Sequence, residues 1–190
     1  MEIVIALALK FWQWSVLIGL ILLGFVINQF DKLKGNKVGF KYKELPHMQP
    51  VTIATKGKGF FGAIIMWLLG TRKWTIVKDF EYNLNGKKYV IHKGFEFDGA
   101  SVPKFLATFL SPVGVLLMGG LVHDWAYKYA SLQPKDKKEP LTLLDQKAAD
   151  IIFRDINIEV NGFKFLSYLA YWALRIGGFM AWNGHRKRDK

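Results

Sequence analysis

The chain has 190 residues and a formal net charge of +12, from 27 lysines and arginines against 15 aspartates and glutamates. It is 51% hydrophobic and 15% aromatic, which excludes a disordered basic tail. It has no cysteine, so a disulfide-stapled miniprotein, zinc bound through thiolates and a cysteine nucleophile are excluded as well. The length fits one domain, or a smaller domain with an anchor.

Residues 11–30, FWQWSVLIGLILLGFVINQF, form an uncharged run that is typical of a transmembrane helix. A helix of this length spans roughly 30 Å, the thickness of a bilayer core. A cleavable signal peptide is the alternative, but the run is long and lacks the basic region and the cleavage site of such peptides. Lysines follow the run, so the positive-inside rule predicts a single-pass membrane protein. Residues 31–190 would lie on the cytoplasmic side, or in the lumen of a membrane-containing virion.

We expect three parts in the chain. Residues 1–30 form the transmembrane anchor, residues 31–73 a linker with short strands and an apolar interfacial helix, and residues 74–190 the domain that carries the sequence motifs. Within the linker, residues 59–70 are free of charge but too few to span a bilayer. A buried helix or an interfacial helix is therefore expected there.

The third part begins with a β-hairpin. Strands are expected at about residues 74–83 and 87–97, since Asn85 and Gly86 between them suit a tight type I′ turn.

Helical sequence follows the hairpin. Residues 105–122 are apolar, but a proline and several glycines argue against a second spanning helix, and we expect a buried or substrate-facing segment. Residues 141–158 and 163–182 are expected to be helices, the latter interrupted by a glycine pair and by Arg175. The predicted fold class is α+β. It comprises an N-terminal transmembrane helix, a small β-hairpin region and a helical domain whose two antiparallel helices carry the His/Asp motifs.

Candidate catalytic residues lie in these helices. On a helix, His123 and Tyr127 share a face, whereas the carboxylate of Asp124 addresses a different neighbour. Asp150, on the next helix, can pair with the imidazole if the two helices are antiparallel. A carboxylate on one ring nitrogen fixes the tautomer and stabilises the imidazolium, as a general base requires.

A candidate metal site precedes them. Asp98 ends a strand in a turn that contains Gly99, where a carboxylate and backbone carbonyls can bind a hard cation such as calcium together with Asp124. Zinc would need more imidazoles than this region offers. An architectural alternative stays open, because a His-Asp pair is often a hydrogen-bonded core pair. Asp150 can equally pair with Arg154, and Asp98 can form an Asx turn.

Four stretches of the sequence resemble an uncharacterised family of phages and prophages, catalogued as domain of unknown function 1353. The stretches are KGFEFDGASVP, LVHDWAY, KAADIIFRDI and RIGGFMAWNG, and the resemblance covers about residues 74–184. It implies a phage or prophage origin and supplies no activity.

The order of a D-G-x-S turn, an H-D-x-x-Y helix and a later D-x-x-F helix also resembles that of bacterial secreted phospholipase A2 enzymes. This likeness implies that His123 is the general base that activates water, with Asp150 as its partner and Tyr127 as a supporting residue. It implies that Asp98 and Asp124 bind calcium, which would polarise the ester carbonyl. The chain departs from those enzymes in its lack of disulfides and in the apolar run before the histidine.

Two function classes follow. The first is a membrane-anchored, phage-type, calcium-dependent esterase of membrane lipid, which contacts the bilayer through residues 11–30 and an aromatic-rich surface. The second is a non-catalytic structural or assembly protein in a virion or host membrane, with other virion proteins as partners. The positive residues are scattered and not joined to base-stacking motifs, so nucleic acid is not expected as a specific partner.

Overall fold

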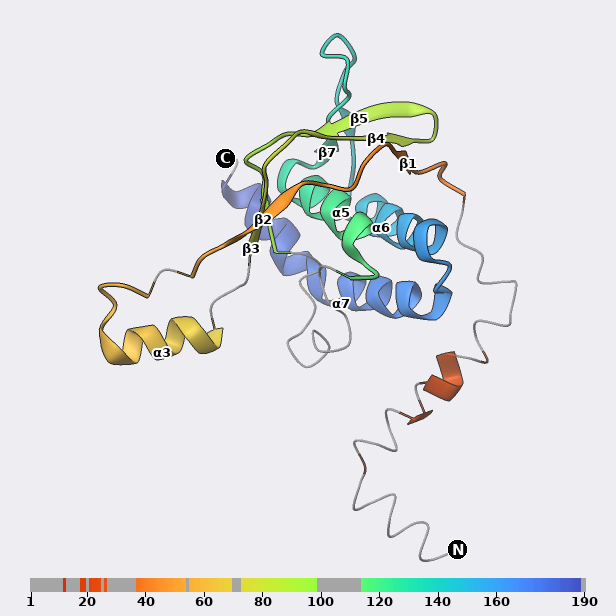
Figure 1. The fold of residues 1–190 in the computed structure, drawn as a ribbon. Helices are drawn as coiled ribbons and strands as arrows, with labels where there is room; N and C mark the ends of the chain where they lie inside the picture. The colour runs from red at the N-terminus through yellow and green to blue at the C-terminus, as the bar shows by residue number, and fades with distance from the viewer. Residues whose placement is uncertain are drawn as a thin grey trace, which may run out of the picture.

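The computed structural model of the chain (Figure 1) describes residues 12, 18–19, 21–24, 26, 37–53, 55–69, 73–98 and 114–188. In this part of the chain the fold is α+β, with small antiparallel sheets packed against helices. The strands are β1 (Lys41–Tyr42), β2 (Met48–Val51), β3 (Lys73–Ile76), β4 (Phe80–Leu84), β5 (Lys87–Ile91), β6 (Glu96–Phe97), β7 (Ser131–Leu132) and β8 (Thr142–Leu143). The longer helices are α3 (Gly59–Leu69), α5 (Leu117–Tyr129), α6 (Gln146–Asn161) and α7 (Lys164–Arg188).

The expected hairpin turn is present between β4 and β5. Both turn residues have positive φ, 51° for Asn85 and 81° for Gly86, as a type I′ turn requires. Each of the two predicted strands is nevertheless divided, because the chain bends after Ile76 and again after Ile91. β4 and β5 join β1 in one sheet, whereas β3 and β6 join β2 in another.

Hydrogen bonds at the bend explain this division. The Asp79 carboxylate accepts a bond of 2.7 Å from the backbone N–H of Lys93, and it lies 3.2 Å from Nδ1 of His92. Gly94 has a φ of 84°, and its N–H donates to the carbonyl of Ile76 at 2.7 Å. These bonds replace the regular ladder of a long hairpin and direct the chain into the second sheet.

α6 begins and ends at capping residues. The helix predicted over residues 141–158 begins only after Asp145, whose carboxylate accepts the N–H of Ala148 at 2.7 Å. It ends at Gly162, which has a φ of 69°. α7 continues through the glycine pair that was expected to interrupt it, so that part of the prediction is wrong.

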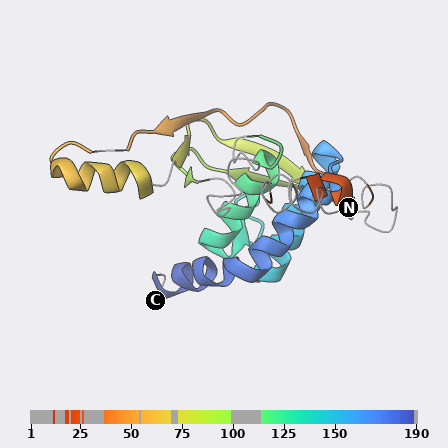
Figure 2. The same cartoon turned by 90° about the horizontal axis from the view of Figure 1, so that it is seen from below.

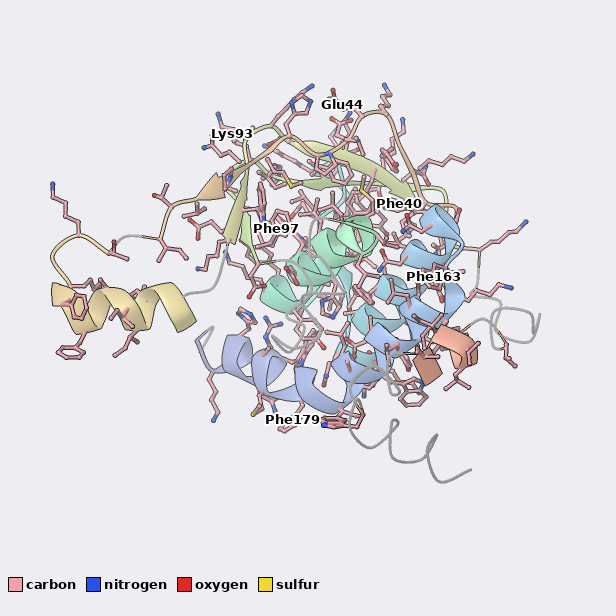
Figure 3. The ribbon with its side chains drawn as sticks, turned by 60° about the horizontal axis from the view of Figure 1, so that its bottom comes forward. Phe40, Glu44, Lys93, Phe97, Phe163 and Phe179 are labelled. Atoms are coloured by element: carbon pink, nitrogen blue, oxygen red, sulfur yellow. The ribbon has the colours of Figure 1, made fainter. Side chains whose placement is uncertain are left out.

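The main hydrophobic core lies between the hairpin sheet and α5, with α6 and α7 packed on the other side of α5 (Figures 1 and 2). The sheet contributes Phe80, Tyr82 and Ile91, and α5 contributes Leu121 and Val122. The predicted burial of the apolar run is confirmed from Leu116 to Val122, whereas Gly114 and Val115 are exposed; residues 99–113 lie outside the described part of the chain. Figure 3 shows Phe179 on the outer side of α7, away from this core.

The predicted transmembrane helix is not supported. Most of residues 11–30 lie outside the described part of the chain. Among the helices that the structure does describe, none combines the length and the hydropathy needed to cross a membrane. α3 has only 11 residues, and Arg175 with several polar side chains interrupts the apolar sequence of α7. The assignments of a spanning anchor, of a single-pass topology and of a cytoplasmic or luminal side are corrected accordingly.

Candidate active site

A buried carboxylate, that of Asp150 in α6, lies at the centre of the candidate site. The side chain has no exposed surface and accepts hydrogen bonds from three others. His123 Nε2 lies 2.9 Å from Oδ1, the Tyr127 hydroxyl donates to Oδ1 at 2.7 Å, and Arg175 Nη1 donates to Oδ2 at 2.7 Å. Because His123 and Tyr127 belong to α5 and Arg175 to α7, one carboxylate joins three helices.

The antiparallel packing of α5 and α6 brings these residues together. Near the start of α5, the backbone N–H of Gly119 donates to Oδ1 of Asn157 at 3.2 Å, close to the end of α6. Near the end of α5, the Tyr127 hydroxyl accepts a bond of 3.2 Å from Nε2 of Gln146, at the start of α6. Glycine is needed at position 119, because a Cβ there would lie 2.6 Å from the carbonyl oxygen of Phe153.

The second ring nitrogen of His123 has a different environment. Nδ1 makes no hydrogen bond in the described part of the chain, and it lies 3.5 Å from Oδ1 of Asp124. Since Asp150 is an acceptor, Nε2 carries the hydrogen of the bond to it, and in the neutral ring the lone pair is on Nδ1. The ring itself is 3% exposed and packs against Tyr127 at a centroid distance of 4.0 Å.

The surrounding charges shift the pKa values of this pair in opposite directions. Burial lowers the pKa of His123, but the two nearby carboxylates, Asp124 at 3.5 Å from Nδ1 and Asp150 at 2.9 Å from Nε2, together raise it above its ordinary value. Burial raises the pKa of Asp150, but the bonds donated by His123, Tyr127 and Arg175 together hold it below its ordinary value. The carboxylate is therefore ionised at neutral pH, and the imidazole readily accepts a proton.

The predicted metal ligands are described only in part. Asp98 directly follows β6 and Asp124 belongs to α5, whereas Gly99 lies outside the described residues. Both carboxylates have the hard oxygen donors that calcium prefers. In the described ranges, however, no group of three or more His, Asp or Glu side chains is placed to bind a metal ion. The convergence of these residues on one cation stays a prediction.

Arg175 and Gln146 are site residues that sequence reasoning missed. Arg175 was recognised as unusual within an apolar helix, and its need for a buried counter-ion was the signal that could have linked it to Asp150. The alternative pairing of Asp150 with Arg154 is wrong, because Arg154 Nε donates to Oδ1 of Asp155 at 2.7 Å.

Comparisons with known proteins identify a family without an activity. No curated protein and no solved structure matches the chain. The expected phage origin and the likeness to phospholipase A2 enzymes stay predictions. A family model described as "Protein of unknown function (DUF1353)" matches residues 74–174, which include the histidine, tyrosine and aspartate of the candidate site. Since this match covers more than half of the 190 residues, the chain belongs to the DUF1353 family.

Proposed function

We propose that the chain hydrolyses carboxylic esters of lipid, with His123 as the general base. The observation that carries the proposal is the unequal environment of the two ring nitrogens. Nε2 bonds a buried carboxylate at 2.9 Å, whereas Nδ1, which is also buried, makes no hydrogen bond among the described residues and lies 3.5 Å from the Asp124 carboxylate. A base needs this combination, in which one nitrogen is held by an anion and the other can accept a proton.

In the proposed reaction, His123 Nδ1 removes a proton from a water molecule while the water oxygen attacks the ester carbonyl. The ionised Asp150 stabilises the imidazolium that forms. The imidazolium then returns the proton to the alcohol oxygen as the tetrahedral intermediate collapses, so that a carboxylic acid and an alcohol are released. Tyr127 and Arg175 act as positioning residues, because both bond the carboxylate and not the reacting atoms.

Calcium is the proposed cofactor. Asp98 and Asp124, with backbone carbonyls near Gly99, would hold the ion. When bound, calcium would polarise the ester carbonyl and stabilise the negative charge on its oxygen.

The test is hydrolysis of short-chain p-nitrophenyl esters and of phospholipid vesicles, with added calcium or with a chelator. His123→Ala should reduce the turnover number by about 10²–10⁴-fold. His92→Ala is the matched control, because this imidazole is exposed and pairs with Asp79 away from the site. The wild-type rate should rise with pH through a pKa above the ordinary histidine value, since only the neutral ring accepts a proton. Circular dichroism of both variants shows whether the fold is kept.

A second candidate function is a non-catalytic structural or assembly role. The near-complete burial of His123, 3% exposed, favours it, because a core pair of this kind also fixes the packing of two helices. Under this alternative, the wild type hydrolyses none of these esters in calcium or in chelator, and His123→Ala changes only the free energy of unfolding. That result would overturn the proposed activity.

A further inference from the structure

α3 stands apart from the rest of the fold. It lies in the connection between β2 and β3, and both Figure 1 and Figure 2 show it projecting away from the sheets and from α5, α6 and α7. Among the side chains of α3 that the structure describes, those of residues 59–66, none belongs to the hydrophobic core clusters. Phe60, Phe61 and Ile65 are 75%, 78% and 55% exposed.

The sequence of α3, GFFGAIIMWLL, contains no charged or hydrogen-bonding side chain except the indole of its tryptophan. A helix that is apolar on all sides is normally covered, either by the protein core or by lipid. Large exposed apolar patches mark interaction sites. With 11 residues, α3 is only about 16 Å long, so it cannot cross a bilayer core of about 30 Å.

The charges beside α3 favour an anionic surface as the occupant. Between Glu44 and Asp79 the sequence has no acidic residue, and its cationic residues are Lys56, Lys58, Arg72, Lys73 and Lys78. Lys78 pairs with Glu44, and Lys73 lies 3.5 Å from Glu96. Lys56 and Lys58 directly precede the exposed phenylalanines, and both lysines are exposed. Aromatic side chains beside lysines are typical of helices that lie in the headgroup region of a membrane.

We propose that α3 is an interfacial anchor, which inserts Phe60, Phe61 and Ile65 into the surface of an anionic bilayer while Lys56 and Lys58 contact lipid headgroups. The helix lies on the membrane and does not span it. This inference is independent of the proposed hydrolysis, because it uses no residue of the candidate active site.

The first test is sedimentation of the full chain with vesicles of phosphatidylcholine alone or mixed with phosphatidylglycerol. The wild type should bind the mixed vesicles more tightly, and added salt should weaken that binding. The double variant Phe60→Ser, Phe61→Ser should bind mixed vesicles at least about tenfold more weakly, because two apolar side chains no longer enter the membrane. Its fold should be retained, since the replaced side chains are exposed.

Charge variants separate the local effect of the lysines from that of net charge. Lys56→Glu with Lys58→Glu should weaken binding to mixed vesicles by about tenfold or more. Lys137→Glu with Lys138→Glu changes the net charge equally, at exposed positions remote in sequence from α3, and should leave binding near the wild-type value. His123→Ala should bind as the wild type does, even if it abolishes hydrolysis.

A polarity-sensitive fluorophore attached to α3 tests directly whether this helix enters the bilayer. Because the chain has no cysteine, Ile65→Cys and Leu143→Cys can each carry a single polarity-sensitive fluorophore. Leu143 is the control, since it is 77% exposed on β8. Mixed vesicles should shift the emission at position 65 to shorter wavelength and leave position 143 unchanged. Equal emission at position 65 with and without vesicles would overturn the proposal. So would dimerisation in the absence of lipid that the two serine substitutions abolish, because a second copy would then cover α3.

Discussion

α3 and α5 are both short helices with apolar sequences that contain glycine, yet they have opposite surroundings. Nine residues of α5 are buried, whereas Phe60, Phe61 and Ile65 of α3 are exposed. The side chain of His123 in α5 bonds Asp150 of α6, and the backbone N–H of Gly119 in α5 donates to Asn157 of α6. Apart from the indole of its tryptophan, the sequence of α3 has no hydrogen-bonding side chain. An apolar sequence alone therefore does not show whether the protein core covers a helix, whereas polar side chains with partners on a neighbouring helix do.

The largest loss in the free energy of unfolding is expected when the central carboxylate, that of Asp150, is removed. Asp150→Ala leaves the buried His123 and the guanidinium of Arg175 without their anion, and should lower the free energy of unfolding by about 3–5 kcal/mol. Chemical denaturation measures this loss. Asp136→Ala, at an exposed position, is the control and should change the free energy by less than about 0.5 kcal/mol. A loss below about 1 kcal/mol for Asp150→Ala would mean that the packing of α5, α6 and α7 does not depend on the hydrogen bonds to Asp150.

A smaller difference in the free energy of unfolding is expected when glycine is replaced by alanine in α5 and in α3. Gly119→Ala places a methyl group 2.6 Å from the carbonyl oxygen of Phe153 and against Asn157, and should cost about 1–3 kcal/mol of stability. Gly62→Ala meets only the flexible Lys58 side chain at 3.2 Å, and alanine favours helix by up to about 1 kcal/mol over glycine. Denaturation of both variants checks the contrast. Equal losses would show that α3 is packed as tightly as α5.

The sequence was sufficient for the local features of the fold. The Asn85-Gly86 turn follows from residue types at fixed spacing, and the structure has it. The pairing of His123 with Asp150 was expected only if their two helices are antiparallel, and the structure has that arrangement as well. The division of the hairpin into two sheets was not predictable, because it depends on Asp79 meeting the backbone of Lys93 across the bend. Such a contact leaves no periodic signal in the sequence.

Arg175 shows a second limit of the sequence. Its position in an apolar helix signalled a buried partner, but several acidic residues were available, and only the packing of α7 on α6 selects Asp150. The transmembrane prediction had a related weakness, because it rested on the length of an apolar run and on the residues that flank it. α3 shows that an apolar helix can also lie exposed beside the fold.

The most direct test of the candidate site is nuclear magnetic resonance of the His123 ring nitrogens as a function of pH. The His123 resonances are identified as those that are absent from the spectrum of His123→Gln. The neutral ring should carry its proton on Nε2, which bonds Asp150, and should leave Nδ1 unprotonated. Its pKa should lie above the ordinary value of 6.5 and should fall in Asp150→Asn. A proton on Nδ1 of the neutral ring, or a pKa below 6.5, would contradict the assignment of His123 as a base held by Asp150.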